Sequence, residues 1–394
     1  MATLTAVELL AHLQTISANP PTEITTNASL RNELATAAKN LFLTLEKPED
    51  VVARILLSQP VEGVTVRIAI DLKLFSILKE GERTLDQLVQ ATNATPVLLN
   101  NLAAFGAVKE VGELYSLSPT YGLFADQGFA AGLASCGDFL NPAYLALPGY
   151  LNSTNYRAPS DPKDTAVQKA FGAKGKDLVG ILTERPDSAR GFGTLMSTWG
   201  EGNSLIQDIY PINERLSSGF DRSSQPEQVM WVDVGGGYGQ KTISLKRDCP
   251  SLPGRFIVQD LPGTIQNAPQ TEGIENMGHD FFTAQPIKGA RAYYIRQCLH
   301  NWPRTECLTI LTELRKAMEP DYSKLFVHEL IVPERGASTW VVTQDFNMMT
   351  LCAKMERTEQ QWRQLLLDAG LKVVGVHSAA DGVSEGLIEA EATK

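Results

Sequence analysis

The sequence predicts an α/β protein built on a doubly wound, mostly parallel sheet, preceded by an all-helical and winged-helix region. From residue 229 onward, short apolar runs alternate with helical segments, which is typical of parallel strands joined by crossover helices. Before residue 125, apolar residues recur at helical spacing and a small hairpin follows them. The predicted strands are 229–234, 255–259, 292–297, 324–330 and 372–377.

The composition is that of a folded protein with an acidic balance. The 394 residues carry 35 Lys and Arg against 45 Asp and Glu, a formal net charge of −10, which argues against a general nucleic-acid binder. The longest uncharged run near the middle, 139–156, contains prolines and asparagines and is not expected to span a membrane. No secretory signal is visible, and the five cysteines are scattered. We therefore expect no disulfide framework, no metal site and a cytoplasmic location.

Residues 1–125 are expected to form a dimerisation domain. The first 60 residues are predicted to be helical, with one apolar stripe formed by Val7, Leu9, Leu10, Leu13 and Ile16. Residues 30–45 continue this pattern. The stripe has two possible partners, a second subunit or its own domain, and we expect a homodimer.

A winged-helix unit is predicted after residue 63. Val64–Leu78 is an apolar helix, Thr84–Gln87 is a capping box that opens a second helix, and Thr95–Pro96 begin a third. The segment 109–117 is predicted to be a hairpin. The third helix contains no Arg or Lys, which a DNA-reading winged helix would carry, so the unit is predicted to serve packing or dimerisation.

Residues 126–394 are expected to form the second domain. Its first part, 131–228, is predicted to be helical and rich in aromatic residues. Breaks in these helices are expected at Pro142, Pro148, Pro162, Pro186 and Pro211.

The sharpest motif lies at the end of the first parallel strand. Val232–Gly239 is rich in glycine, which lets a ligand approach the backbone, and it precedes a helix. Asp260 ends the next strand, and a carboxylate there accepts hydrogen bonds from both hydroxyls of a ribose. The glycine spacing is not GxGxxG, and Asp233 suits a cationic amino group better than a pyrophosphate. These features predict a nucleoside-type cofactor other than NAD.

His300 follows the predicted strand 292–297, at the carboxyl end where ligands bind in an open α/β sheet. An imidazole there is a candidate general base, titrating near pH 6–7 when mildly perturbed. Glu329 ends another strand and Glu356 lies further along the chain. A base flanked by two carboxylates follows the logic of a catalytic triad.

Together these motifs resemble those of class I S-adenosylmethionine-dependent O-methyltransferases, of the plant caffeate and flavonoid type and of fungal secondary metabolism. The motifs are, in chain order, DVGGGYG (233–239), QDLP (259–262), HDF (279–281), LHNW (299–302), DFNMM (345–349) and ERT (356–358). The resemblance covers nearly the whole chain. It implies a Rossmann-like catalytic domain, S-adenosylmethionine as cofactor and a small-molecule acceptor.

The resemblance also implies a role for each matching residue. The implied cofactor contacts are Asp233, Gly235, Gly237, Asp260, Leu261, Asp280, Phe281 and Arg296, the last standing where the family usually has a lysine. His300 would deprotonate the acceptor hydroxyl, with Glu329 and Glu356 beside it. The candidate acceptor-pocket residues are Ser135, Phe171, Met196, Trp199, Asn347 and Met348. Pro303-Arg304 departs from the family's Ser/Pro-Asp, a change expected to have little catalytic effect.

A second resemblance keeps another enzyme class open. Residues 164–171, 254–262 and 273–277 are similar to fungal methyltransferase-like pericyclases, which keep S-adenosylmethionine bound but catalyse dehydration or cycloaddition. The catalytic features expected there, a His near Ser135 and an Arg-Asp pair at His300-Asn301, are not present in this sequence. We therefore predict methyl transfer to a phenolic or enolic hydroxyl of an aromatic or polyketide-type metabolite, with a pericyclase as the alternative. A non-catalytic winged-helix regulator is disfavoured by the uncharged third helix.

Overall fold

A computed structural model describes most of the chain. It covers residues 5–202, 205–220, 227–378 and 385–393, with side chains except at 25, 28 and 196–202. The contacts divide the chain into two compact units. The first comprises 1–32, 156–165 and 203–394, and the second comprises 33–155 and 166–202.

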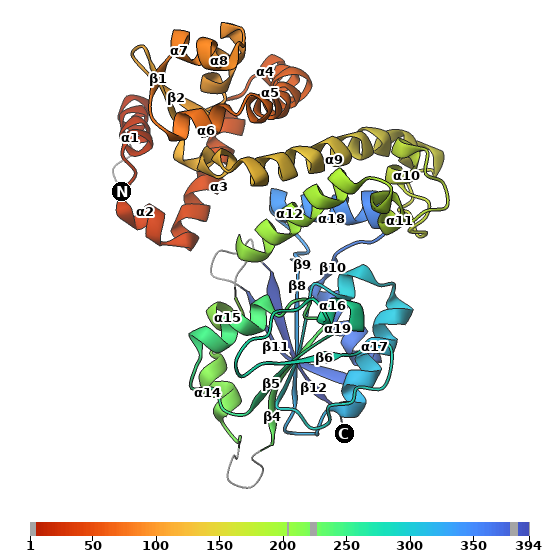
Figure 1. The fold of residues 1–394 in the computed structure, drawn as a ribbon. Helices are drawn as coiled ribbons and strands as arrows, with labels where there is room; N and C mark the ends of the chain where they lie inside the picture. The colour runs from red at the N-terminus through yellow and green to blue at the C-terminus, as the bar shows by residue number, and fades with distance from the viewer. Residues whose placement is uncertain (1–4, 203–204, 221–226, 379–384, 394) are drawn as a thin grey trace. The chain divides into compact units, whose positions relative to one another are not determined.

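The first unit contains the large sheet seen in Figure 1. It has seven strands in the order β11-β12-β8-β7-β4-β5-β6. Its strands are β4 (Val229–Val234), β5 (Arg255–Asp260), β6 (Glu275–Gly278), β7 (Ala292–Arg296), β8 (Lys324–Glu329), β11 (Leu371–Ser378) and β12 (Gly386–Ala392). The pairs from β8 to β6 are parallel, whereas β12 is antiparallel to both β8 and β11. The predicted doubly wound, mostly parallel sheet is confirmed. The strand β12 was missed, because its GLIEAEA segment carries two buried or half-buried acids where a core strand is expected to be apolar.

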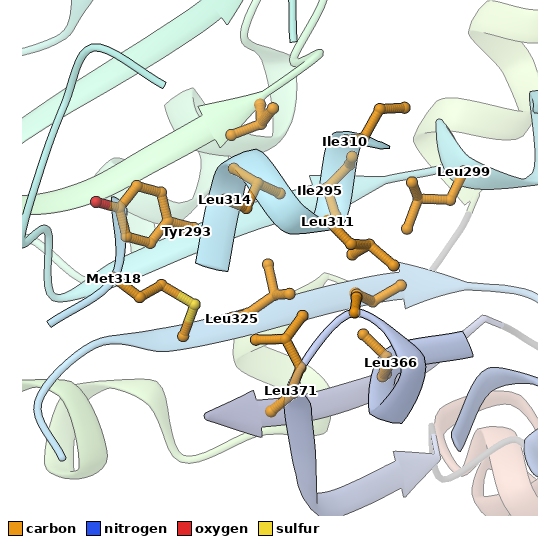
Figure 2. Packing of buried hydrophobic residues seen from close by; sticks show 14 of the residues in the cluster. Tyr293, Ile295, Leu299, Ile310, Leu311, Leu314, Met318, Leu325, Leu366 and Leu371 are labelled. Atoms are coloured by element: carbon orange, nitrogen blue, oxygen red, sulfur yellow. The ribbon is translucent and has the colours of Figure 1, made fainter. Parts of the chain in front are cut away.

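Helices cover both faces of this sheet. Alternate residues of one strand serve different faces, as Tyr293 and Tyr294 of β7 show by belonging to separate apolar clusters. On one face, α17 (Arg304–Ala317) and α19 (Glu359–Asp368) contribute Leu311, Leu314 and Leu366 to an apolar core (Figure 2). Each such buried side chain stabilises the fold by about 1.5–3 kcal/mol relative to exposure.

The other face is covered by shorter helices. These are α13 (Ile206–Ile209), α14 (Ile212–Ser217) and α15 (Gln240–Asp248), which pack on Trp231 and Phe256. The remaining elements of this part are α16 (Pro262–Ile265), η3 (Leu299–Asn301), β9 (Ile331–Val332), α18 (Thr339–Cys352) and β10 (Arg357–Thr358).

The predicted helices near the N-terminus are present. They are α1 (Ala6–Ala18), α2 (Thr22–Thr26), α3 (Ala28–Leu45), α4 (Pro48–Ala53) and the π-helix η1 (Arg54–Ser58). The apolar stripe of α1 is exposed in the single chain, and Val7 is 77% accessible. The partner surface that would cover this apolar stripe therefore stays a prediction.

The second and third helices and the hairpin predicted after residue 63 also form, whereas the first helix is divided in two. They comprise α5 (Gln59–Asp71), α6 (Leu74–Lys79), β1 (Arg83–Thr84), α7 (Leu85–Thr92), α8 (Pro96–Ala104), β2 (Val108–Val111) and β3 (Leu114–Leu117), followed by η2 (Pro119–Ala125). The capping box is confirmed, since the Gln87 N–H donates to Thr84 Oγ1 at 3.3 Å and the Thr84 N–H donates to Gln87 Oε1 at 2.9 Å. The single helix predicted over 64–78 was wrong. Lys73 adopts a left-handed conformation (φ 54°) that ends α5 and starts α6.

Two of the predicted helix breaks were also wrong. Pro142 and Pro148 lie inside the long helix α9 (Gln127–Ser153). A proline costs a helix interior about 3 kcal/mol, and packing along α9 offsets this cost. Phe139 is buried and stacks on Phe171 with ring centroids 5.0 Å apart.

Three more helices complete the second unit: α10 (Ala166–Phe171), α11 (Leu178–Thr183) and α12 (Pro186–Gly202). The other expected breaks fit the structure, because Pro186 begins α12, Pro211 precedes α14 and Pro162 lies in a turn. Over the residues described, no helix has both the length and the apolar run that crossing a membrane requires.

Candidate active site

The glycine-rich turn joins β4 to α15 at the carboxyl edge of the sheet. The N–H groups of Gly235 and Gly236 both donate to the Gln259 carbonyl, at 2.8 and 3.0 Å, which ties the turn to β5. Gly235 has φ 71°, and a Cβ there would lie 2.7 Å from Cys298 Sγ. Only glycine fits this position, because Cys298 fills the space that a side chain would need.

Asp260 is oriented by the backbone around it. Its Oδ2 accepts the Gly237 N–H at 2.9 Å and its Oδ1 accepts the Leu261 N–H at 2.8 Å. The Leu261 side chain is 56% exposed beside it. Asp260 therefore presents a fixed carboxylate next to the glycine turn, where the sequence predicted one.

Asp233 lies under the same turn and is buried. Thr242 Oγ1 donates to its Oδ2 at 2.6 Å, and a Cβ on Gly236 would come within 2.6 Å of its carboxyl carbon. Burial raises the pKa of Asp233 to about 6, against the hydrogen bond from Thr242 and the positive charge of Arg296. Asp233 thus supports the glycine turn from beneath. The sequence did not predict this structural role for Asp233.

The segment after β6 brings an aromatic side chain to the turn. Asp280 Oδ1 accepts the Phe282 N–H at 3.0 Å, which fixes the local loop. The ring of Phe281 would be 3.4 Å from a Cβ on Gly235. It also packs edge-on against Trp302, with centroids 6.2 Å apart. The structure therefore places the HDF motif beside the glycine turn.

His300, Glu329 and Glu356 form a tight cluster next to this edge. His300 Nδ1 lies 2.9 Å from Glu356 Oε1 and 3.9 Å from Glu329 Oε2. Glu329 Oε1 accepts the backbone N–H groups of Cys298 and Leu299 at 3.0 and 2.9 Å. The three candidate catalytic side chains, which are far apart in sequence, thus meet in space.

The carboxylates change the titration of His300. Burial disfavours the imidazolium, but the charge of Glu329 and the hydrogen bond and charge of Glu356 outweigh it and raise the pKa of His300 to about 9. The pH 6–7 expected for this imidazole was therefore too low. The correction comes from the two buried acids, and burial in turn raises the pKa of Glu329.

The same three side chains offer ligand atoms within 4.8 Å of one another. This spacing is one that a divalent cation could use. The same spacing suits a base oriented by two carboxylates. The backbone hydrogen bonds accepted by Glu329 favour this second interpretation over a cation site.

Arg296 is engaged by an acid that the sequence analysis missed. Its Nε and Nη2 donate to the two oxygens of Glu385 at 2.6 and 2.7 Å, and Gln297 Nε2 donates to the same carboxylate. Glu385 is buried and Arg296 is mostly buried, with 2% and 13% of their side-chain area exposed. No motif surrounds Glu385, so only the pairing of β12 with β8 could have revealed it.

A cavity of about 460 Å³ opens beside the candidate residues His300 and Glu356. His300, Trp302, Lys354 and Glu356 are among its lining residues. The ammonium group of Lys354 lies 5.2 Å from the centre of the Trp302 ring.

The predicted acceptor-pocket residues are spread over both units. Asn347 and Met348 lie on α18, and Asn347 is buried. In the second unit, Ser135 lines a separate cavity of about 310 Å³ on α9, and Phe171 packs on Phe139 and under Arg185. Met196 and Trp199 belong to α12 but lie outside the residues whose side chains are described. A shared pocket for these residues stays a prediction.

Comparison with known proteins gives a consistent result. Residues 221–372 match the sequence profile of the O-methyltransferase domain. A demethylsterigmatocystin 6-O-methyltransferase of Aspergillus flavus is 36% identical over 334 residues, covering 82% of this chain and 84% of the relative.

Solved structures resemble the chain over almost its full length. LepI in complex with SAM superposes with a TM-score of 0.85 at 29% identity, covering 99% of this chain and all of that one. A structure described as a pericyclic reaction enzyme gives the same TM-score and identity and covers 98% of this chain.

Proposed function

Since the chain belongs to the O-methyltransferase family, we propose that it transfers a methyl group from S-adenosylmethionine to a hydroxyl of a small aromatic or polyketide-type metabolite. The observation that supports this most is the cluster of His300 with Glu329 and Glu356 beside the glycine turn. One relative is named for methyl transfer to demethylsterigmatocystin, which agrees with an acceptor of this class.

S-adenosylmethionine is the cofactor, and the residues at the carboxyl edge fit it. Gly237 has open space where a side chain would lie, so the cofactor can approach the backbone there. The carboxylate of Asp260 is fixed by two N–H groups and suits the ribose hydroxyls. Phe281 offers an apolar face to adenine, with Asp280, Leu261 and the buried acid Asp233 as further contacts. When bound, this cofactor supplies an electrophilic methyl group on a sulfonium sulfur.

His300 removes the proton of the acceptor hydroxyl. Its Nδ1 is engaged by Glu356, so Nε2 is the nitrogen that faces the acceptor. Glu356 fixes the tautomer, and Glu329 stabilises the imidazolium that forms. A base with a pKa of about 9 is well matched to a phenol with a pKa of about 10.

The test is incubation with methyl-labelled S-adenosylmethionine and a panel of hydroxylated aromatic and enolic acceptors. We expect label in the product and an equal amount of S-adenosylhomocysteine. The His300→Ala variant should lose about 10²–10⁴-fold in turnover and keep its affinity for the cofactor. Normal turnover by this variant, or product without label, would contradict the proposal.

A second function is supported by the charge of His300. With a pKa of about 9 the imidazole is mostly protonated at neutral pH, and an imidazolium can donate a hydrogen bond to a substrate carbonyl. The likeness to the pericyclic reaction enzyme agrees with this chemistry. In that case product forms without release of S-adenosylhomocysteine, and His300→Gln keeps substantial activity.

We also propose that the chain functions as a homodimer through residues 1–125. Large apolar side chains are exposed on η1, where Leu56 and Leu57 are 67% and 64% accessible. Such a patch is typical of a protein–protein contact.

A further inference from the structure

A buried cation lies beside the proposed cofactor site. In the sheet, Tyr294 of β7 pairs with Asp233 of β4, and Arg296 is two residues further along the same strand. Arg296 is therefore level with the turn that begins at Gly235. Its charge acts on Asp233, because it opposes the rise in the pKa of that acid.

This cation is unfavourable for a positively charged ligand unless it is neutralised. S-adenosylmethionine carries a sulfonium charge that its product, S-adenosylhomocysteine, lacks. For an assumed separation of about 10 Å and an effective dielectric constant of about 20, two like unit charges weaken binding by roughly an order of magnitude. Arg296 alone would thus favour the neutral product over the charged cofactor.

Glu385 supplies the opposite charge. It holds Arg296 through two hydrogen bonds of 2.6 and 2.7 Å and is 2% exposed. His328 Nε2 lies 3.4 Å from the same carboxylate. Burial and the nearby cations hold the pKa of His328 well below its usual value, so this ring stays neutral. The carboxylate also faces the half-buried Lys241, whose pKa burial and Arg296 lower to about 8, while Glu385 opposes that shift.

We propose that Glu385 is a positioning residue that makes the site accept a sulfonium cofactor, because it cancels the charge of Arg296 beside the glycine turn. This inference rests on the proposed function. The new element is that Glu385, a residue outside the family motifs, determines how well the site discriminates between the charged cofactor and its neutral product.

The test compares the dissociation constants of S-adenosylmethionine and S-adenosylhomocysteine by calorimetry. In Glu385→Gln we expect the ratio of the two constants to shift about tenfold against S-adenosylmethionine, with S-adenosylhomocysteine still bound. In Arg296→Gln the negative charge of Glu385 is no longer balanced by Arg296, so the ratio should shift in the opposite direction. The two shifts of opposite sign distinguish a charge effect from a loss of structure.

Glu389→Gln is the matched control. Glu389 lies on β12, is also buried, and pairs with Arg215 at 3.2 Å and with Lys324 at 3.5 Å. It stands opposite Phe326, three residues before the carboxyl end of β8, whereas Glu385 lies at that end. The Glu389→Gln ratio should therefore equal that of the wild type.

The outcomes are distinguishable. An unchanged ratio in Glu385→Gln, with S-adenosylhomocysteine still bound, would overturn the role of Glu385 alone. If Glu385→Gln does not fold, Arg296→Gln decides, and an unchanged ratio or a shift against S-adenosylmethionine there overturns the inference. A wild-type chain that binds neither molecule would overturn the proposed function as well.

Discussion

Replacing Glu356 by Gln should lower the pKa of His300 and slow methyl transfer together. The variant keeps the size of the side chain but removes the charge that lies 2.9 Å from Nδ1. A hydrogen bond to a charged group contributes about 1.5–3 kcal/mol, which corresponds to about one to two pKa units. The pKa of His300 is about 9 in the wild type, so it should fall to about 7–8 in the variant.

The assay is kcat/KM for methyl transfer between about pH 6 and 10, which reports ionisations of the free enzyme. The base must lose its proton before it accepts another, so the wild-type rate should rise with pH through about 9. In the variant the rise should move to lower pH, and the plateau should fall about ten- to a hundredfold, because the same free energy no longer stabilises the imidazolium. Two acceptors of different acidity separate this ionisation from that of the substrate.

Glu359→Gln is the control for this experiment. Glu359 pairs with Arg363 on the exposed side of α19, at 2.7 Å. Its removal should leave the pH profile unchanged. A wild-type midpoint at pH 6–7, or the same midpoint in wild type and Glu356→Gln, would refute the assignment of His300 and Glu356 as a coupled base and acid.

Three further predictions concern the cofactor and the assembly. Asp260→Ala should weaken binding of S-adenosylmethionine in calorimetry by about 1.5–3 kcal/mol for each ribose hydrogen bond lost, and unchanged affinity would remove the nucleoside-site argument. Gly235→Ala should abolish this binding, because its Cβ would lie 2.7 Å from Cys298 Sγ. Gly237 has a similar φ but open space around it, so Gly237→Ala should weaken binding less. Equal losses of affinity in the two variants would show that backbone strain alone is responsible. Light scattering should give twice the 43.0 kDa chain mass, and Leu56→Asp with Leu57→Asp should give the monomer; a wild-type monomer at micromolar concentration would contradict the dimer.

The parts of the fold that the sequence predicted are those with strong local signals. The apolar run of β4 and the capping box at Thr84 each depend on a few neighbouring residues. The wrong predictions depend on distant contacts instead. Pro148 breaks an isolated helix, but α9 is held by packing that no local pattern reveals.

The candidate site shows the same limit. The carboxyl ends of parallel strands share one edge, so the meeting of His300 and Glu329 could be expected from their positions. The pKa of His300 could not, because it depends on distances of 2.9 and 3.9 Å to two buried carboxylates. The importance of Glu385 could not be predicted either, because it comes from contact with the Arg296 side chain on β7.

The charge of His300 also bears on which acceptor the site can use. At neutral pH the resting imidazole is mostly protonated, so it can act as a base only after it has lost that proton. An acidic phenol or enol makes this easier, because its own proton is exchanged with solvent at a similar pH and the imidazolium stabilises the resulting anion. A substrate that offers only a carbonyl would receive a hydrogen bond from the same imidazolium and keep its oxygen unmethylated. The presence of an ionisable hydroxyl on the substrate would therefore decide between methyl transfer and carbonyl activation, with no change in the residues around it.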